Sequence, residues 1–203
     1  MSELSVQKEQ LWSKLERECA ECTACELCRS RQNVVFGFGD KKARIMFIGE
    51  APGESEDLSG LPFVGAAGRL LDDMLLIMGF SREQVYIANI LKCRPPHNRD
   101  PLPEEQCRCF GYLERQIELV NPRMIVCLGR IAAARIIHEN FKITVEHGNF
   151  VKRGERTLTA IYHPSALLRD LSKRPETFDD LKKIREFMQT PDVSEVWGTP
   201  LAD

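Results

Sequence analysis

Four apolar segments of the chain end in the same way, and this repetition restricts the fold more than any other feature of the sequence. ARIMFIGEAPG, VYIANILKC, RMIVCLG and TLTAIYHPS each run from aliphatic residues into glycine, proline or polar residues. Patterns typical of helices lie between them, at 67–78, 104–120, 131–139 and 178–188. Buried strands that alternate with helices indicate a parallel sheet covered on both faces. We therefore expect an α/β fold with three layers (α/β/α) and a central, mainly parallel four-stranded sheet.

The same pattern places most of the chain in one unit. Residues 5–18 have apolar side chains at helical spacing, so we expect a helix that leads into a cysteine-rich segment. A length of 203 residues with 43% hydrophobic residues suits one domain with a substantial core. We expect a single domain over 1–188, including the N-terminal helix and the cysteine segment, and a C-terminal tail at 189–203.

Composition narrows the cellular setting. The sequence has no apolar run of membrane-spanning length and no basic segment followed by an apolar one at its start. We expect a cytoplasmic, monomeric protein without a membrane partner. A net charge of -2 argues against a protein that coats nucleic acid nonspecifically, although a local basic groove is compatible with it.

The loop after the first predicted strand, GEAPGESEDLSGLPFVGAAGRLL, is rich in glycine and in carboxylates. It lacks the G-x-x-x-x-G-K-[ST] pattern of phosphate-binding loops, and its acidic residues would repel phosphate. Phe63, between proline and glycine residues, can form the wall of a pocket. A pocket for a neutral, flat ligand fits this loop better. Ligand sites of parallel sheets form beyond the carboxyl ends of the strands, where Glu50, Asn89 and His163 are expected.

Three segments, GEAPGESED with PFVG, NILKCRPPHNRDPLPEE and HPSALLR, closely resemble in that order the family 4 uracil-DNA glycosylases. The resemblance runs from about Cys22 to about Arg169. It implies the uracil-DNA glycosylase fold and a monofunctional enzyme of base-excision repair. Such an enzyme flips uracil out of DNA and hydrolyses its N-glycosidic bond, leaving an abasic site. The expected partner is uracil-containing DNA.

The resemblance also implies a uracil-binding set. Asn89 matches the residue whose amide pairs with N3–H and O4 of uracil, although an asparagine here can also simply cap the following loop. Phe63 matches the stacking aromatic, and Glu56 the residue beside C5 that disfavours the thymine methyl group. The full uracil-binding set consists of Glu50, Ala51, Pro52, Glu56, Phe63, Asn89 and His163.

Two residues are candidates for catalysis. His163 follows an apolar strand, and a hydrogen bond from it to uracil O2 would stabilise the charge that develops as the bond breaks. Glu50 stands where some related glycosylases have an aspartate general base. Its carboxylate can activate the attacking water, or backbone carbonyls can hold that water instead.

The segment after His163 is the predicted DNA contact. Leu167 and Leu168 would form an apolar wedge that enters the base stack, and Arg169 would meet phosphates together with Lys173 and Arg174. The alternative is the start of a helix with ordinary solvated charges.

Eight cysteines in a cytosolic protein indicate metal ligands or reduced core thiols. CAECTACELC spaces Cys19, Cys22, Cys25 and Cys28 regularly, but the resemblance implies a different ligand set: Cys22, Cys25, Cys93 and Cys109. Four thiolates suit zinc or an iron-sulfur cluster, and spacing alone leaves both open. The resemblance implies a structural [4Fe-4S] cluster, which would present Arg94 and Arg99 toward DNA. An alternative uses Cys28 in a ferredoxin-like N-terminal set.

Two other functions compete with the glycosylase. One is a non-turnover uracil-DNA binding protein of the same superfamily, which traps the flipped base. Proteins of that kind have an extra basic, histidine-containing loop just after the first motif. The corresponding segment here, EDLSGLPFVG, is short and contains no histidine, which argues against this function. The other is an electron carrier built on the Cys19–Cys28 run, which leaves Asn89 and His163 unexplained.

Overall fold

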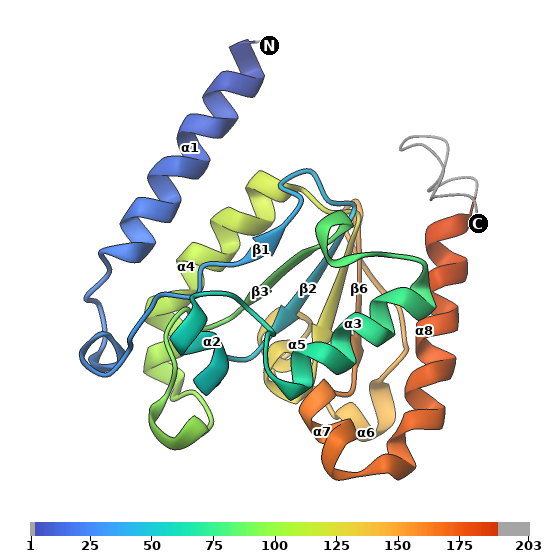
Figure 1. The fold of residues 1–203 in the computed structure, drawn as a ribbon. Coiled ribbons are helices and arrows are strands. Elements are labelled where there is room, and N and C mark those ends of the chain that lie inside the picture. Colours follow the sequence, from blue (N-terminus) through green and yellow to red (C-terminus); the bar gives the residue numbers. More distant parts are fainter. Residues whose placement is uncertain (1–2, 191–203) are drawn as a thin grey trace.

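A sheet between two layers of helices forms the core of the protein (Figure 1). The computed structural model describes residues 3–190, with side chains from residue 6 onward. Within this part the sheet has six strands in the order β1-β3-β2-β4-β6-β5. Four central strands are parallel: β2 (Ile45–Gly49), β3 (Tyr86–Asn89), β4 (Met124–Leu128) and β6 (Arg156–Ile161). The predicted tail lies outside the described residues, apart from 189–190.

Two short strands at the edges complete the sheet. β1 (Phe38–Gly39) pairs antiparallel with β3, and β5 (Val151–Arg153) pairs antiparallel with β6. The predicted α/β/α fold with a mainly parallel sheet is confirmed, and the four predicted strands are its centre. The edge strands have only two and three residues, too few to produce a periodic pattern in the sequence.

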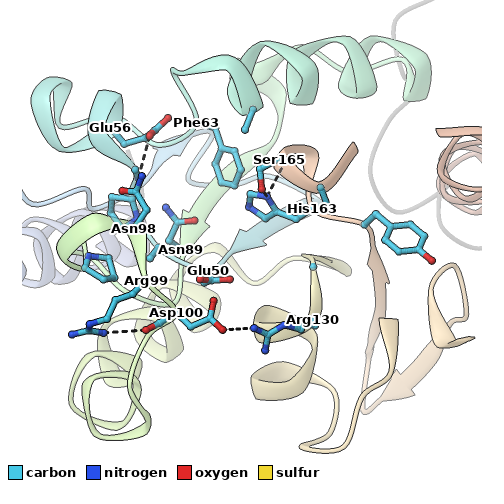
Figure 2. A pocket seen from close by; sticks show the side chains of 18 of the residues that line it. Glu50, Glu56, Phe63, Asn89, Asn98, Arg99, Asp100, Arg130, His163 and Ser165 are labelled. Atoms are coloured by element: carbon cyan, nitrogen blue, oxygen red, sulfur yellow. Dashed lines mark hydrogen bonds and ion pairs between the residues drawn. The ribbon is translucent and has the colours of Figure 1, made fainter. Parts of the chain in front are cut away.

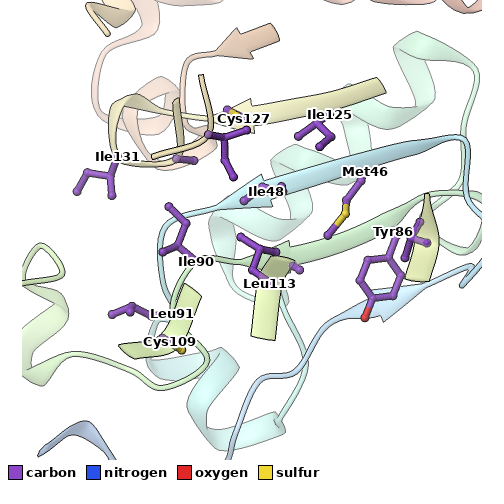
Figure 3. Close-up of a cluster of buried hydrophobic side chains, with 14 of the residues drawn as sticks. Met46, Ile48, Tyr86, Ile90, Leu91, Cys109, Leu113, Ile125, Cys127 and Ile131 are labelled. Atoms are coloured by element: carbon purple, nitrogen blue, oxygen red, sulfur yellow. The ribbon is translucent and has the colours of Figure 1, made fainter. Parts of the chain in front are cut away.

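Both faces of the sheet are buried, which explains why the strands read as continuous apolar runs. Met46 and Ile48 face a cluster completed by α1 (Glu3–Ala20), α4 (Pro103–Val120) and α5 (Arg130–Ile136), part of which Figure 3 shows. Ile45 and Phe47 face the opposite cluster, which α3 (Ala66–Met78), α7 (Pro164–Arg169) and α8 (Arg174–Gln189) complete. Alternate residues of one strand therefore anchor both helical layers.

Local sequence signals explain where the longer helices begin and end. Pro103 starts α4, and the Glu105 carboxylate accepts the N–H of Leu102 at 2.8 Å. α3 ends at Gly79, whose φ of 83° is the left-handed conformation that glycine adopts without strain. The remaining short elements are α2 (Glu54–Ser59), α6 (Ile143–Glu146) and 3₁₀ turns at Glu26–Arg29, Arg82–Gln84, Pro96–Asn98 and Leu171–Lys173. Among residues 3–190, no helix has the length and apolarity needed to cross a membrane.

The register of the sheet determines where functional residues meet. Gly49 lies opposite Asn89, and Leu128 lies opposite Ile161. The residues that follow these strand ends, including Glu50 and His163, therefore gather at one edge of the sheet, as parallel topology requires.

Candidate active site

A cleft of about 460 Å³ opens at the carboxyl ends of the parallel strands (Figure 2). It brings together the whole uracil-binding set predicted from the sequence: Glu50, Ala51, Pro52, Glu56, Phe63, Asn89 and His163. Arg169, a predicted DNA contact, also lines it. Further walls that the sequence pattern did not identify come from Pro95, Asn98, Asp100, Arg130 and Ser165.

Asn89 presents an unpaired hydrogen-bond acceptor in this cleft. The residue is 1% exposed, and its Oδ1 has no hydrogen-bond partner within the described part of the chain. A buried, unpaired amide oxygen costs about 1–3 kcal/mol, so it marks a place where a ligand donor belongs. Gly49 makes room for it, because a Cβ there would lie 2.3 Å from Asn89 Oδ1 and 2.5 Å from Phe63 Cζ.

His163 is held as a neutral imidazole. Its Nδ1 accepts the backbone N–H of Ser165 at 3.1 Å and lies 2.7 Å from Ser165 Oγ. Burial, reinforced by the Arg169 charge, lowers the pKa of His163 from 6.5 to about 4. Since Nδ1 is the acceptor, the single proton of the neutral ring lies on Nε2. His163 is therefore a hydrogen-bond donor to the cleft.

Phe63 has a backbone conformation that only a specific contact explains. Its φ is 54°, in the left-handed region, which costs a residue with a side chain on the order of 1–3 kcal/mol. Arg82 holds this turn: Nη1 donates to the Pro62 carbonyl at 2.8 Å, Nη2 donates to the Phe63 carbonyl, and Nε donates to Asp72 at 2.9 Å. The Phe63 ring centre then lies 5.7 Å from that of His163. No sequence motif identified Arg82.

Glu56 organises the same loop from the other side. Its carboxylate accepts the backbone N–H groups of Gly53, Val64 and Gly65 at 3.1, 2.8 and 2.9 Å. These bonds tie the start of α2 to the turn that follows Phe63. Glu56 also lines the cleft. Its place beside uracil C5 stays a prediction.

Glu50 has an electrostatic setting suited to proton transfer. Burial, followed by the nearby Asp100 carboxylate, raises its pKa from 4.5 to about 7, and Arg130 and Arg169 oppose the rise. Asp100 and Arg130 form an ion pair across the cleft (Figure 2). Carboxylic acids with a pKa near neutrality are typical of general acids and bases.

The structure corrects one of the predicted DNA contacts. Leu167 is 2% exposed and packs in the core beneath α7, so it offers no apolar wedge. The exposed leucines of the segment after His163 are Leu168 (42%) and Leu171 (60%). Arg174, predicted to meet phosphates, donates from Nε to the Leu167 carbonyl at 3.2 Å. A six-residue helix is too short for its sequence to show which leucine faces inward.

The two arginines expected to face DNA have protein partners. Arg99 binds both carboxylate oxygens of Glu105, at 2.9 and 2.6 Å. Arg94 donates to Asn98 Oδ1 at 2.8 Å. Both side chains thus brace the loop between β3 and α4.

A second, smaller cavity, which we call the cysteine cage, gathers cysteines from distant parts of the chain. It is lined by six of them, the four predicted ligands and the two flanking thiols: Cys19, Cys22, Cys25, Cys28, Cys93 and Cys109. Arg31 Nη1 donates to Cys93 Sγ at 3.3 Å, and the backbone N–H of Lys92 donates to Cys109 Sγ at 3.3 Å. Burial raises the pKa of the Cys109 thiol to about 11, so its thiolate form needs a positive partner.

In the described region, no three Cys, His, Asp or Glu side chains are placed to bind a single metal ion. Cys19 is 1% exposed within the apolar core, Cys107 is exposed, and Cys127 is buried in β4. Cys127 is therefore a core thiol.

A model of the uracil DNA glycosylase superfamily matches residues 36–189. The chain belongs to this superfamily. It is 50% identical over 178 residues to a Type-4 uracil-DNA glycosylase of Archaeoglobus fulgidus, covering 84% of this chain and 89% of that protein. The corresponding protein of Sulfurisphaera tokodaii is 46% identical over 88% of this chain and 85% of its own length. That of Thermotoga maritima is 43% identical over 90% and 97%. The resemblance to family 4 is confirmed.

Proposed function

We infer that this chain is a uracil-DNA glycosylase of base-excision repair, which flips uracil out of DNA and hydrolyses its N-glycosidic bond. The superfamily and its Type-4 relatives support this function. The observation that carries it is the unpaired Oδ1 of Asn89, buried in a cleft between Phe63 and the donor His163.

Uracil matches these groups in its pattern of donors and acceptors. Asn89 Oδ1 accepts N3–H, and its amide nitrogen donates to O4, while Phe63 covers the face of the ring. Cytosine presents an acceptor and an amino group at those positions. It would leave two polar pairs unmatched, at about 1–3 kcal/mol for each group.

Bond cleavage leaves negative charge on uracil O2 and positive charge on the sugar. The neutral His163 donates from Nε2 to O2, and this bond strengthens as the charge develops. Glu50, with a pKa of about 7, is partly ionised near neutrality and can orient and deprotonate the attacking water.

In the cysteine cage, a [4Fe-4S] cluster would be held by Cys22, Cys25, Cys93 and Cys109. Support comes from the family resemblance and from the N–H···S bonds to Cys93 and Cys109. When bound, the cluster cross-links the N-terminal segment to the loop after β3. Hydrolysis transfers no net electrons, so its role is structural.

The DNA partner approaches the cleft over α7, where Leu168 is exposed and Arg169 lines the opening. We propose that the enzyme acts as a monomer. We place the enzyme in the cytoplasm, in keeping with reduced thiols.

The test is incubation with a uracil-containing oligonucleotide, followed by alkaline cleavage. We expect strand cleavage, released uracil and no protein adduct, and an adduct in place of turnover would support the trapping function. Asn89→Ala should lower kcat/KM about 100-fold or more, because two hydrogen bonds to the base are lost. Asn149→Ala, at an exposed position outside the cleft, is the matched control. Intact uracil strands after incubation with iron-loaded protein would reject the function.

A further inference from the structure

Lys92 is a buried cation with an unusual set of partners. The residue is 1% exposed and lies between Asn89, at the end of β3, and Cys93 in the cage. Its Nζ donates to the Asn89 carbonyl at 2.9 Å, the Phe36 carbonyl at 3.2 Å and Gln116 Oε1 at 2.6 Å. All three ammonium protons are therefore used, and every acceptor is neutral.

Neutral acceptors satisfy the protons of Lys92 but do not balance its charge. Burying an ammonium group costs several kcal/mol unless a negative charge lies close by. No carboxylate among the described residues forms an ion pair with Lys92. The groups nearby that can become negative are the thiols of Cys19 and Cys109, which interact electrostatically with it. Lys92 also lines the cysteine cavity, and its backbone N–H donates to Cys109 Sγ.

We propose that Lys92 is the buried counter-ion of the thiolate-bound cluster, and that it positions Asn89 for uracil from that place. A cluster bound by four thiolates would carry net negative charge. The buried ammonium of Lys92, whose backbone N–H donates to Cys109 Sγ, would balance it. The inference deepens the proposed function, because it rests on the cluster and on the role of Asn89.

The positioning part follows from the network around Lys92. Gln116, fully buried on α4, receives the Lys92 bond and donates to the Phe36 carbonyl at 2.9 Å and to Tyr86 Oη at 3.1 Å. Tyr86 begins β3 and Asn89 ends it. The ammonium therefore holds the end of the strand that carries the uracil-binding amide, and the charge of the cluster keeps the ammonium in place.

The first test separates the charge of Lys92 from its hydrogen bonds. Lys92→Gln removes the charge, whereas Gln116→Leu breaks the same network and keeps the charge. Thermal unfolding is measured for both variants with iron and after chelation, together with the rate of iron loss to a chelator. We expect Lys92→Gln to lower the Tm more with iron than without it, and to release iron several-fold faster. Gln116→Leu should lower the Tm about equally in both states. Equal losses for Lys92→Gln would overturn the counter-ion role.

The second test measures positioning through Asn89. Lys92→Gln in iron-loaded protein should lower kcat/KM for uracil-containing DNA about tenfold, and it should add little to Asn89→Ala. Fully additive losses would overturn the positioning role. A wild-type protein that holds iron but releases no uracil would reject the proposed function, and the iron-dependent Tm would still test Lys92. A wild-type protein that binds no iron would overturn the counter-ion role directly.

Discussion

Glu50 and His163 face the same cleft, and burial shifts their proton equilibria so that both are uncharged more of the time than in water. The pKa of Glu50 is raised to about 7, and that of His163 is lowered to about 4. In each case the folded state disfavours the charged form, because burial removes water from it. At the scale of single residues, these shifts predict measurable pH dependence.

The first prediction concerns the stability of Glu50→Gln. The folded pKa of Glu50, about 7, lies above its ordinary value of 4.5, so the folded state keeps a proton that the unfolded state releases. The stabilisation is fully present below pH 4.5 and is lost as the pH rises through 7. The stability of Glu50→Gln relative to wild type should therefore increase by about 3 kcal/mol between pH 4.5 and pH 8, since one pKa unit corresponds to about 1.4 kcal/mol. Urea unfolding at both pH values measures it, with the exposed Glu54→Gln as control. A pH-independent difference would contradict the assignment.

The second prediction concerns the proton of His163. We expect a neutral ring with the proton on Nε2 from pH 5 to pH 8, because Nδ1 accepts the Ser165 N–H and the pKa is about 4. Since the folded pKa is depressed, the associated stability is present above pH 6.5 and is lost as the pH falls toward 4. Nitrogen chemical shifts of labelled protein report the tautomer. A proton on Nδ1, or titration near pH 6.5, would contradict the donor role.

At the scale of elements, the turn before α3 presents Phe63 because Arg82 holds two consecutive carbonyls. We predict that Arg82→Gln lowers kcat/KM about tenfold, since without this contact the left-handed conformation is disfavoured by on the order of 1–3 kcal/mol. The same change should have little further effect in Phe63→Ala, in which the ring is absent. Steady-state kinetics of the four proteins measures the coupling. Arg69→Gln, exposed on α3, is the control. Equal effects in both backgrounds would show that Arg82 acts elsewhere.

The strands and their ends were predictable because hydrophobic runs and parallel topology are properties of local sequence. Glu50, Asn89 and His163 follow from that rule alone. Arg82 and Lys92 were not predictable, because their roles depend on carbonyls and side chains brought close only by folding. Arg31 bonds to Cys93 across 62 residues, a contact that no local pattern reports. Leu167 shows the converse, since its motif indicated an exposed wedge and the packing of α7 buried it.

At the scale of the whole molecule, hydrogen bonds join the cysteine segment 20–31 to the loop after β3 and to α4. Arg31 donates to Cys93 Sγ at 3.3 Å, and Arg108 of α4 donates to the Ala24 carbonyl at 3.0 Å. The central strands, in contrast, are buried on both faces. The cluster proposed for the cysteine cage would add a cross-link between these two parts.

The last prediction follows from that cross-link. Cys22→Ser should lose iron and lower the free energy of unfolding by about 4 kcal/mol. This is the chain-entropy value for cross-linking the loop between Cys22 and Cys93. Amide hydrogen exchange should accelerate at 20–31, while β2 and β4 stay protected because their burial does not depend on the cluster. Cys107→Ser, at an exposed position outside the cage, should keep its iron and its exchange pattern. Iron retention by Cys22→Ser, or faster exchange throughout the sheet, would show that the cluster is held differently or that it supports the whole core.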